Sequence, residues 1–258
     1  MPTDDEPAEP AESGPDEFEL RPGFRHDLYS LPEVFVAATT APGHPPDTRT
    51  PQEIRTWCLH LLDRPGRELW VAVRDEVPLG FVLLEGDWVN LIFVHPHRPA
   101  RGVGAALLDL VKGLRPHGFG LRVYQANERA RAFYRKHGLV ELERTDGSSY
   151  HDAEPDLQMA WPGDDPLAYL RRRIDGVDDE LAVLLARRTA LTGAVQDHKV
   201  ASGDAAGEQG RDPDREAEIV ERMARHVPGL GPERIAAVMH TVIDESIAAW
   251  EATNDARG

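Results

Sequence analysis

The chain is poor in cysteine, because Cys58 is the only one among its 258 residues. A single cysteine cannot form a disulfide within one chain, which favours a reducing compartment. Long apolar runs are also missing, since none approaches the roughly 18 residues of a membrane helix. The first residues are acidic, whereas a secretory signal begins with basic ones. These absences predict a cytoplasmic protein with no membrane partner.

Basic residues are scarce as well. Lysine and arginine number 29 against 45 aspartates and glutamates, so the net charge is −16 and the pI is about 5.1. Such an acidic chain is not expected to bind nucleic acid. The charge is concentrated at the start, where residues 1–17 contain seven acids and no base. Because this proline-rich stretch cannot bury enough apolar surface to fold, we predict a disordered acidic tail over residues 1–16.

The rest of the chain is long enough for two domains, and its first part alternates strand and helix patterns. Apolar runs predict strands at 69–73, 79–84, 88–94, 120–124 and 157–161, with a short extended segment at 17–21. The first two runs predict a hairpin around Glu76-Val77-Pro78. Thr50-Pro51 is typical of a helix start, and two more helices are predicted at 101–114 and 128–137. Residues 17–163 are therefore expected to form an α/β domain with a mixed sheet.

After residue 163 the pattern changes to steps of three and four residues, which predict an all-α domain over 164–254. One long helix runs from about Leu167, and the Gly-rich segment 201–210 predicts a loop. Asp212-Pro213 begins a second helix that ends at Pro228-Gly229, and Gly231-Pro232 begins a third. Two short helices cannot cover the apolar stripe of the long one. We therefore expect a homodimer through these helices.

Several basic residues of this domain lie on or near the apolar stripe. Arg188 and Lys199 are 11 residues apart, so they differ by only about 20° around the helix. Arg171 lies about 100° away from Arg188, and an antiparallel partner helix could return it to the same place. Arg215 sits in the first turn of the second helix, where an anion is favoured. From this geometry alone, a solvated charged face is the competing interpretation.

Three segments keep fixed spacings: Leu170-Arg171-x-x-Ile174-Asp175-x-x-Asp178-x-x-Leu181, then Leu184-Leu185-Ala186-x-Arg188 with Lys199, and Arg211-Asp212-x-Asp214-Arg215-Glu216. Together they resemble the all-helical chorismate mutases across 167–250. The resemblance implies an intertwined three-helix dimer that rearranges chorismate to prephenate without a cofactor. Such a reaction requires a protein to hold a near-attack conformer and to stabilise charge on the ether oxygen.

The resemblance also implies a role for each polar residue of the site. One arginine comes from the opposite subunit, while a lysine donates to the ether oxygen whose bond breaks. The implied residues are Arg188 and the partner's Arg171 on the carboxylates, Lys199 on the ether oxygen, Arg215 at the carboxylate end, Asp212 and Glu216 on the hydroxyl side, and Ser246 in the pocket lining. The family usually places glutamine or glutamate where this chain has Trp250. The substrate is therefore left open between chorismate and the substrates of 4-amino-4-deoxychorismate mutases or isochorismate pyruvate-lyases.

In the first domain, the predicted strand 91–94 is followed by Arg101-Gly102-Val103-Gly104-Ala105 at a helix start. Backbone amides at such a turn can bind a pyrophosphate, although a plain tight turn has the same sequence. A second segment, Asn127 to Leu139, follows a strand and opens a helix. In this order and spacing, the two segments resemble the GNAT acyltransferases.

This second resemblance implies that acetyl-CoA binds between two splayed parallel strands, near 89–94 and 121–124, and that an unknown amine accepts the acetyl group. The general base is open between Glu85, Asp87 and water, and a solvated strand end is the better interpretation of either acid. Pro99 stands where the family prefers glutamine or arginine, with Arg98 one place early. The implied residues are the backbone of Phe93, Val94, Arg101, Gly102, Val103, Gly104 and Ala105 for the cofactor, with Asn127 lining the site and Tyr134 protonating the leaving thiolate.

Three functions remain open at this point. The chain is a bifunctional enzyme, or a mutase with a non-catalytic acetyl-CoA sensor, or an interaction protein that uses its helices to dimerise. His95 and His97 lie close together, but no third ligand has suitable spacing, so no metal is predicted.

Overall fold

The computed structural model describes residues 17–98, 100–147, 154–203, 212–227 and 229–255. The chain divides into two units, Met1–Arg171 and Arg172–Gly258, called here the first unit and the helical unit. The predicted tail 1–16 lies outside the described residues, as do Pro99 and most of the predicted loop 201–210. No helix in the described ranges is long and apolar enough to span a membrane.

The first unit is built on one seven-stranded sheet. Its order is β1-β2-β3-β4-β5-β7-β6, and all neighbouring strands are antiparallel except β4 and β5. The strands are β1 (Glu19–Pro22), β2 (Arg67–Arg74), β3 (Val77–Glu85), β4 (Trp88–Val94), β5 (Phe119–Tyr124), β6 (Val140–Thr145) and β7 (Asp156–Trp161), with a short 3₁₀ helix η1 (Asp27–Tyr29) after β1.

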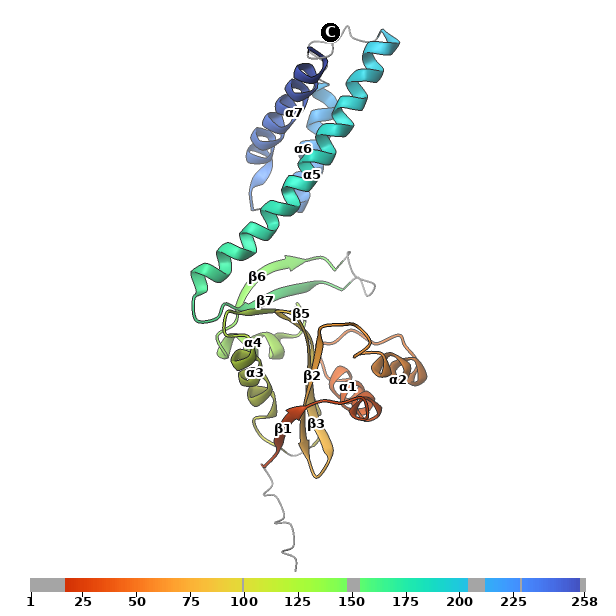
Figure 1. Cartoon of the computed structure of the whole chain (residues 1–258), viewed down its shortest axis with the longest axis vertical. Coiled ribbons are helices and arrows are strands. Elements are labelled where there is room, and N and C mark those ends of the chain that lie inside the picture. Colours follow the sequence, from red (N-terminus) through yellow and green to blue (C-terminus); the bar gives the residue numbers. More distant parts are fainter. Residues whose placement is uncertain (1–16, 99, 148–153, 204–211, 228, 256–258) are drawn as a thin grey trace, which may run out of the picture. The chain divides into compact units, whose positions relative to one another are not determined.

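Helices cover both faces of this sheet. Figure 1 shows α1 (Leu31–Thr39) and α2 (Pro51–Leu59) on one side, with α3 (Val103–Leu114) and α4 (Glu128–Lys136) on the other. The central strand β3 is apolar on both faces: Phe81 and Leu83 join the core under α1 and α2, and Val82 and Leu84 join the core under α3 and α4. This double burial explains why β3 is a continuous apolar run.

The predicted strands and helices of the first unit are confirmed, and the structure adds η1, α1 and β6 to them. The hairpin turn lies at Asp75 and Glu76, which both have positive φ, so it falls one residue before the predicted turn. Neither α1 nor β6 was predicted. β6 is an edge strand with mostly exposed side chains, so its sequence lacks the apolar alternation of the inner strands.

Two helix starts follow the predicted capping chemistry. At α2, Thr50 Oγ1 accepts from the Glu53 N–H at 3.3 Å, and the Glu53 carboxylate accepts from the Thr50 N–H at 2.7 Å. At α6 (Pro213–His226), Asp212 Oδ1 accepts from the Arg215 N–H at 3.0 Å. Each bond satisfies a backbone donor that has no partner inside its helix.

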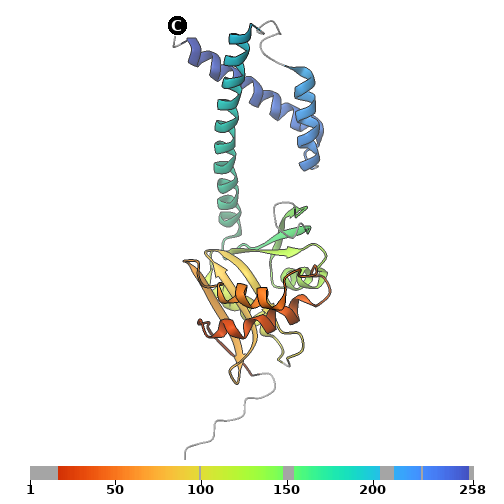
Figure 2. The ribbon, with the colours of Figure 1, turned by 90° about the vertical axis from the view of Figure 1, so that its right-hand side faces the viewer.

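The helical unit contains α6, α7 (Gly231–Asp255) and most of the 37-residue helix α5 (Pro166–Ser202). α6 packs on α7, and α7 crosses α5, as Figure 2 shows. Ile235, Met239 and Ile243 of α7 are buried. Most apolar side chains of α5 remain exposed, among them Leu167, Ile174, Val177, Leu181, Leu184, Leu191 and Val195.

The first turn of α5 belongs to the first unit. Tyr169 is 6% exposed, and its ring lies so close to Gly118 that a Cβ there would come within 2.4 Å of it. Asp165 accepts from the Ala168 N–H at 3.0 Å, which caps the helix. The start of α5 is therefore fixed to the sheet domain by packing and by a cap.

Candidate functional site

The parallel strands β4 and β5 separate soon after they meet. They pair at Trp88–Gly120 and Val89–Leu121, whereas β4 stays paired with β3 up to Val94. β5 likewise stays paired with β7 up to Tyr124. The space between 91–94 of β4 and 122–124 of β5 is called here the strand opening. It leaves backbone groups of β4 free to bind an extended ligand.

The turn at Arg101–Ala105 opens helix α3 beside the end of β4. Gly102 has a φ of 82°, a left-handed conformation that glycine adopts without strain. Among the described residues, the first N–H bonded within the helix is that of Ala106, to the Gly102 carbonyl at 2.9 Å, so the amides of Val103, Gly104 and Ala105 can bind a ligand. The first turn of α3 carries no acidic residue. This turn therefore has the charge and the donors that a pyrophosphate requires.

Asn127 caps the start of α4 beside the strand opening, and Tyr134 lies within α4. Asn127 is buried and caps α4, because its Oδ1 accepts from the Ala130 N–H at 3.0 Å. Tyr134 is 8% exposed, and burial raises the pKa of its phenol well above the ordinary value. The phenol thus stays protonated, which is the form that a proton donor needs.

The helical unit brings two of the predicted residues together. Ser246 is 3% exposed and donates to the Val242 carbonyl at 2.6 Å, so its oxygen accepts from Arg188 Nη1 at 3.0 Å. Arg188 also donates to the Val242 carbonyl at 3.3 Å. Within the part of the chain that the structure describes, Arg188 pairs with no carboxylate. Its charge is met only by neutral oxygens.

The structure gives the following surroundings for the other predicted residues of the helical unit. Lys199 is half-buried, and Glu216 is buried with its Oε2 3.7 Å from His240 Nε2. Asp212 serves as the α6 cap. Arg215 is exposed and pairs with Glu218 at 2.8 Å, and Arg171 is exposed near the start of α5.

Comparison with known proteins agrees with both predicted families. The family model described as an acetyltransferase (GNAT) domain matches residues 65–141, and the model described as chorismate mutase type II matches residues 170–250. The peptidyl-lysine N-acetyltransferase YiaC of Escherichia coli is 36% identical over 151 residues, which cover 55% of this chain and 96% of YiaC. The chain belongs to the GNAT acetyltransferase family through its first unit, and its residues 170–250 match the type II chorismate mutase model.

Two further similarities concern the GNAT domain. The peptidyl-lysine N-acetyltransferase YjaB of Salmonella typhimurium is 32% identical over 99 residues, which cover 38% of this chain and 68% of that protein. A solution structure of apo YjaB from Escherichia coli is 25% identical, covers 57% of this chain and 99% of that chain, and has a TM-score of 0.48. The matches to the two family models confirm the two resemblances predicted from the sequence.

One residue beside the strand opening, His44, was not predicted from the sequence. It lies in the loop between α1 and α2, and its Nε2 is 3.2 Å from Asn127 Nδ2. Its ring centroid is 6.0 Å from that of Phe93 on β4 and 5.8 Å from that of Tyr124 on β5. No local pattern could reveal it, because 83 residues separate His44 from Asn127.

The structure also places Arg98, which stands one position early for the GNAT pattern, and Glu85, a candidate general base. Arg98 pairs with Glu33 of α1 at 2.5 Å and donates to the Pro78 carbonyl of β3, so its side chain links these two elements. Glu85 accepts from Arg67 at 2.8 Å, and this bond lowers the pKa of the Glu85 carboxyl. A carboxylate held in this way is a weak base.

Cys58 is buried in the first unit. Burial raises the pKa of the Cys58 thiol to about 12, so it is no nucleophile near neutral pH. Among the described residues, no group of three or more His, Cys, Asp or Glu side chains could hold a metal ion.

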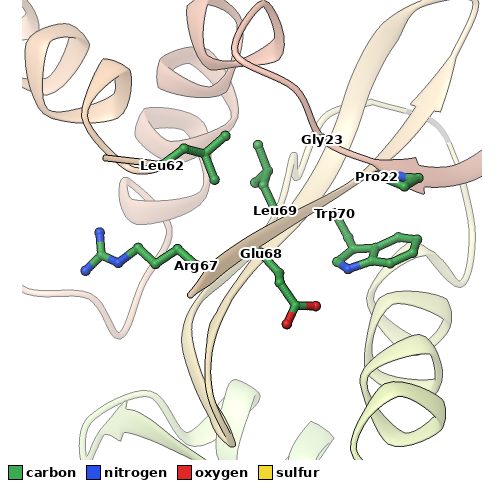
Figure 3. Close-up of a pocket in the computed structure, with 7 residues that line it drawn as sticks. All are labelled: Pro22, Gly23, Leu62, Arg67, Glu68, Leu69 and Trp70. Atoms are coloured by element: carbon green, nitrogen blue, oxygen red, sulfur yellow. The ribbon is translucent and has the colours of Figure 1, made fainter. Parts of the chain in front are cut away.

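A surface hollow of about 370 Å³, shown in Figure 3, lies where β1 ends and β2 begins. None of the described residues of β4 or β5 lines it, so it is separate from the strand opening. Its lining residues are Pro22, Gly23, Leu62, Arg67, Glu68, Leu69 and Trp70.

Proposed function

We propose that the protein is bifunctional: its GNAT unit transfers an acetyl group from acetyl-CoA to a primary amine, and its helical unit rearranges chorismate to prephenate. Early separation of β4 from β5, next to the turn at Arg101–Ala105, supports the first activity. The contact of Arg188 with buried Ser246, and the absence of a carboxylate partner for Arg188 within the described residues, support the second.

The residues of the GNAT unit fit acetyl-CoA. The amides of Arg101–Ala105 would hold its pyrophosphate, and the backbone of Phe93 and Val94 would hydrogen-bond the extended arm. When bound, acetyl-CoA supplies an acyl thioester that an amine can attack. Tyr134 keeps its proton at neutral pH and would give it to the departing sulfur, while Asn127 holds the start of α4 beside the reacting groups.

The amine acceptor is proposed to be a lysine side chain of a protein, because YiaC and YjaB are named peptidyl-lysine N-acetyltransferases. Incubating the full chain with acetyl-CoA and lysine peptides, followed by mass spectrometry, tests this. Calorimetry separates the alternatives: binding of acetyl-CoA without acetylation of any amine would indicate a sensor domain. If the chain does not bind acetyl-CoA at millimolar concentration, both the acetyltransferase and the sensor interpretations are wrong.

The mutase site is proposed to form only in a homodimer. Seventeen residues of α5 separate Arg171 from Arg188, which is about 26 Å along the helix at about 1.5 Å per residue. One chain therefore cannot bring both side chains to one small ligand, but an antiparallel α5 of a second chain can. The exposed apolar side chains of α5, such as Leu181 and Leu184, supply the surface that such a partner would bury.

In that dimer, Arg188 and the partner's Arg171 would grip the carboxylates of the substrate as guanidinium forks. Lys199 would donate to the ether oxygen, where charge develops as the carbon–oxygen bond breaks. The reaction is intramolecular, so no proton changes hands. Sedimentation of the full chain tests the dimer, and a monomer at micromolar concentration with full mutase turnover would contradict it.

Because of Trp250, 4-amino-4-deoxychorismate and isochorismate are kept as alternative substrates. Its indole Nε1 donates to Asp197 Oδ1 at 2.7 Å, so this side chain is turned toward α5 in the single chain. An indole differs in shape from the glutamine or glutamate usual at this position. Incubation with chorismate, 4-amino-4-deoxychorismate and isochorismate distinguishes the substrates. Turnover of one of the last two without turnover of chorismate would replace the first proposal.

A further inference from the structure

The loop 40–50 between α1 and α2 crosses one side of the strand opening. Phe93 and Tyr124 belong to different strands, and both lie beyond the last paired residues of β4 and β5. The His44 ring is about 6 Å from each of their rings, so it spans the strand opening. Because α1 and α2 cover the face opposite α3, this loop lies on the side away from the turn at Arg101–Ala105. The pyrophosphate is proposed to bind at that turn, so the side of the strand opening that the loop borders is left for the acceptor amine.

The hydrogen bond between His44 and Asn127 has a defined direction. Asn127 Oδ1 already accepts from the Ala130 N–H, so the atom that faces His44 is the amide donor Nδ2. His44 Nε2 must therefore accept, which requires a neutral imidazole with its proton on Nδ1. A proton on Nε2 would set two donors against each other and break this bond.

The backbone of the loop is shaped for this contact. Gly43 has a φ of 99°, and a Cβ at this position would come 2.9 Å from Asn127 Cα. Only glycine allows the loop to lie this close to the start of α4. Pro42 and Pro45 flank this pair and restrict the loop further. At the other end of the loop, Arg49 pairs with Asp47, and the Arg49 guanidinium carbon lies 4.5 Å from the Trp57 ring centroid.

We propose that His44 is a positioning residue of the acetyltransferase: its bond to Asn127 holds the α1–α2 loop across the acceptor side of the strand opening, and protonation of His44 releases the loop. This rests on the proposed acetyl transfer. No group-transfer step is assigned to His44, because its lone pair is already engaged by the Asn127 amide.

The groups around His44 favour the neutral ring. Phe93 and Asn127 do not titrate, Tyr124 is the phenol that faces the ring from β5, and Asp47 and Arg49 on the same loop pair with each other. Burial lowers the pKa of His44. The loop is therefore held at neutral and alkaline pH, and it is released only when the pH falls below the ordinary histidine pKa of about 6.5.

Three variants of the full chain test this in acetylation of a lysine peptide. His44→Ala should raise the KM for the peptide about fivefold at pH 7.5, the effect of one net hydrogen bond, with the KM for acetyl-CoA unchanged. His44→Gln should restore that KM, because its side-chain oxygen can accept the same N–H. It should also abolish the wild-type rise in peptide KM at acidic pH. His60→Gln, at an exposed histidine after α2, is the matched control and should behave like wild type.

A large loss of kcat in His44→Gln with KM unchanged would show that His44 transfers a proton and would overturn the positioning role. A second measurement does not depend on turnover. Nitrogen-15 NMR of histidine-labelled protein, assigned with His44→Gln, should show His44 neutral at pH 7 with its proton on Nδ1. A protonated Nε2 at pH 7 would refute the inference even if acetyl transfer is observed. Failure of wild type to acetylate any amine, with the expected NMR signal present, would instead refute the proposed function alone.

Discussion

Replacing Arg188 by alanine is expected to abolish mutase activity while the fold survives. A guanidinium fork makes two charge-assisted hydrogen bonds to a substrate carboxylate, and each contributes about 1.5–3 kcal/mol. Their loss raises the barrier by about 3–6 kcal/mol, which corresponds to a fall of about 10²- to 10⁴-fold in kcat/KM. The lost contacts with Ser246 and Val242 are to neutral oxygens, so folding stability should fall by only about 1–2 kcal/mol.

The assay follows the disappearance of chorismate by its ultraviolet absorbance, with thermal unfolding and sedimentation measured on the same samples. Arg187→Ala is the matched control, because Arg187 is the neighbouring arginine on α5 and is exposed. It should keep wild-type turnover. If Arg188→Ala retained more than a tenth of wild-type kcat/KM, or if both variants lost activity equally, the assignment of Arg188 to the carboxylate would be wrong.

Three other substitutions give further checks. Trp250→Gln, which frees Asp197 and restores the amide usual in the family, should raise kcat for chorismate about tenfold or more if the ether oxygen lacks a second donor beside Lys199, and unchanged or lower turnover would argue against that. Tyr134→Phe should lower kcat for acetylation about 10²-fold at unchanged acetyl-CoA affinity by calorimetry, and equal kcat would exclude Tyr134 as the acid. Asp27→Asn should reduce the free energy of unfolding by about 1.5–3 kcal/mol at pH 7, measured by urea titration. Burial raises the pKa of Asp27, but the hydrogen bonds from Arg21 and from a backbone N–H outweigh burial, so the pKa is lowered. The stability difference between wild type and Asp27→Asn should therefore shrink as the pH falls through that lowered pKa. A stability difference that does not change with pH would contradict the ion pair.

Local chemistry made much of this fold predictable. Thr50 and Asp212 each stand before a proline at a helix start, and both cap as expected, since capping depends on residues within one turn. The three- and four-residue steps placed α5 to within a few residues of its observed bounds, Pro166–Ser202. The double-sided burial of β3 likewise follows from its continuous apolar sequence.

Contacts between distant segments were not predictable in this way. The bond between His44 and Asn127 exists because a loop folds across two strands, and neither residue carries a local signal for the other. Gln196 of α5 is 7% exposed, although its sequence neighbours Val195 and Asp197 are exposed. Its burial is set by the crossing of other helices, which the periodicity of one helix does not encode.

The anchoring of Tyr169 against Gly118 has a practical consequence for separating the two activities. A cut at residue 163, in the proline- and glycine-containing segment, would remove the Tyr169 ring from its contact with Gly118 in the sheet domain. It would also expose that ring to water on the helical fragment. A cut after Arg171 would spare the acetyltransferase fragment but remove an arginine that the mutase is proposed to borrow from its partner. Each activity is thus better isolated by point substitution in the intact chain than by truncation.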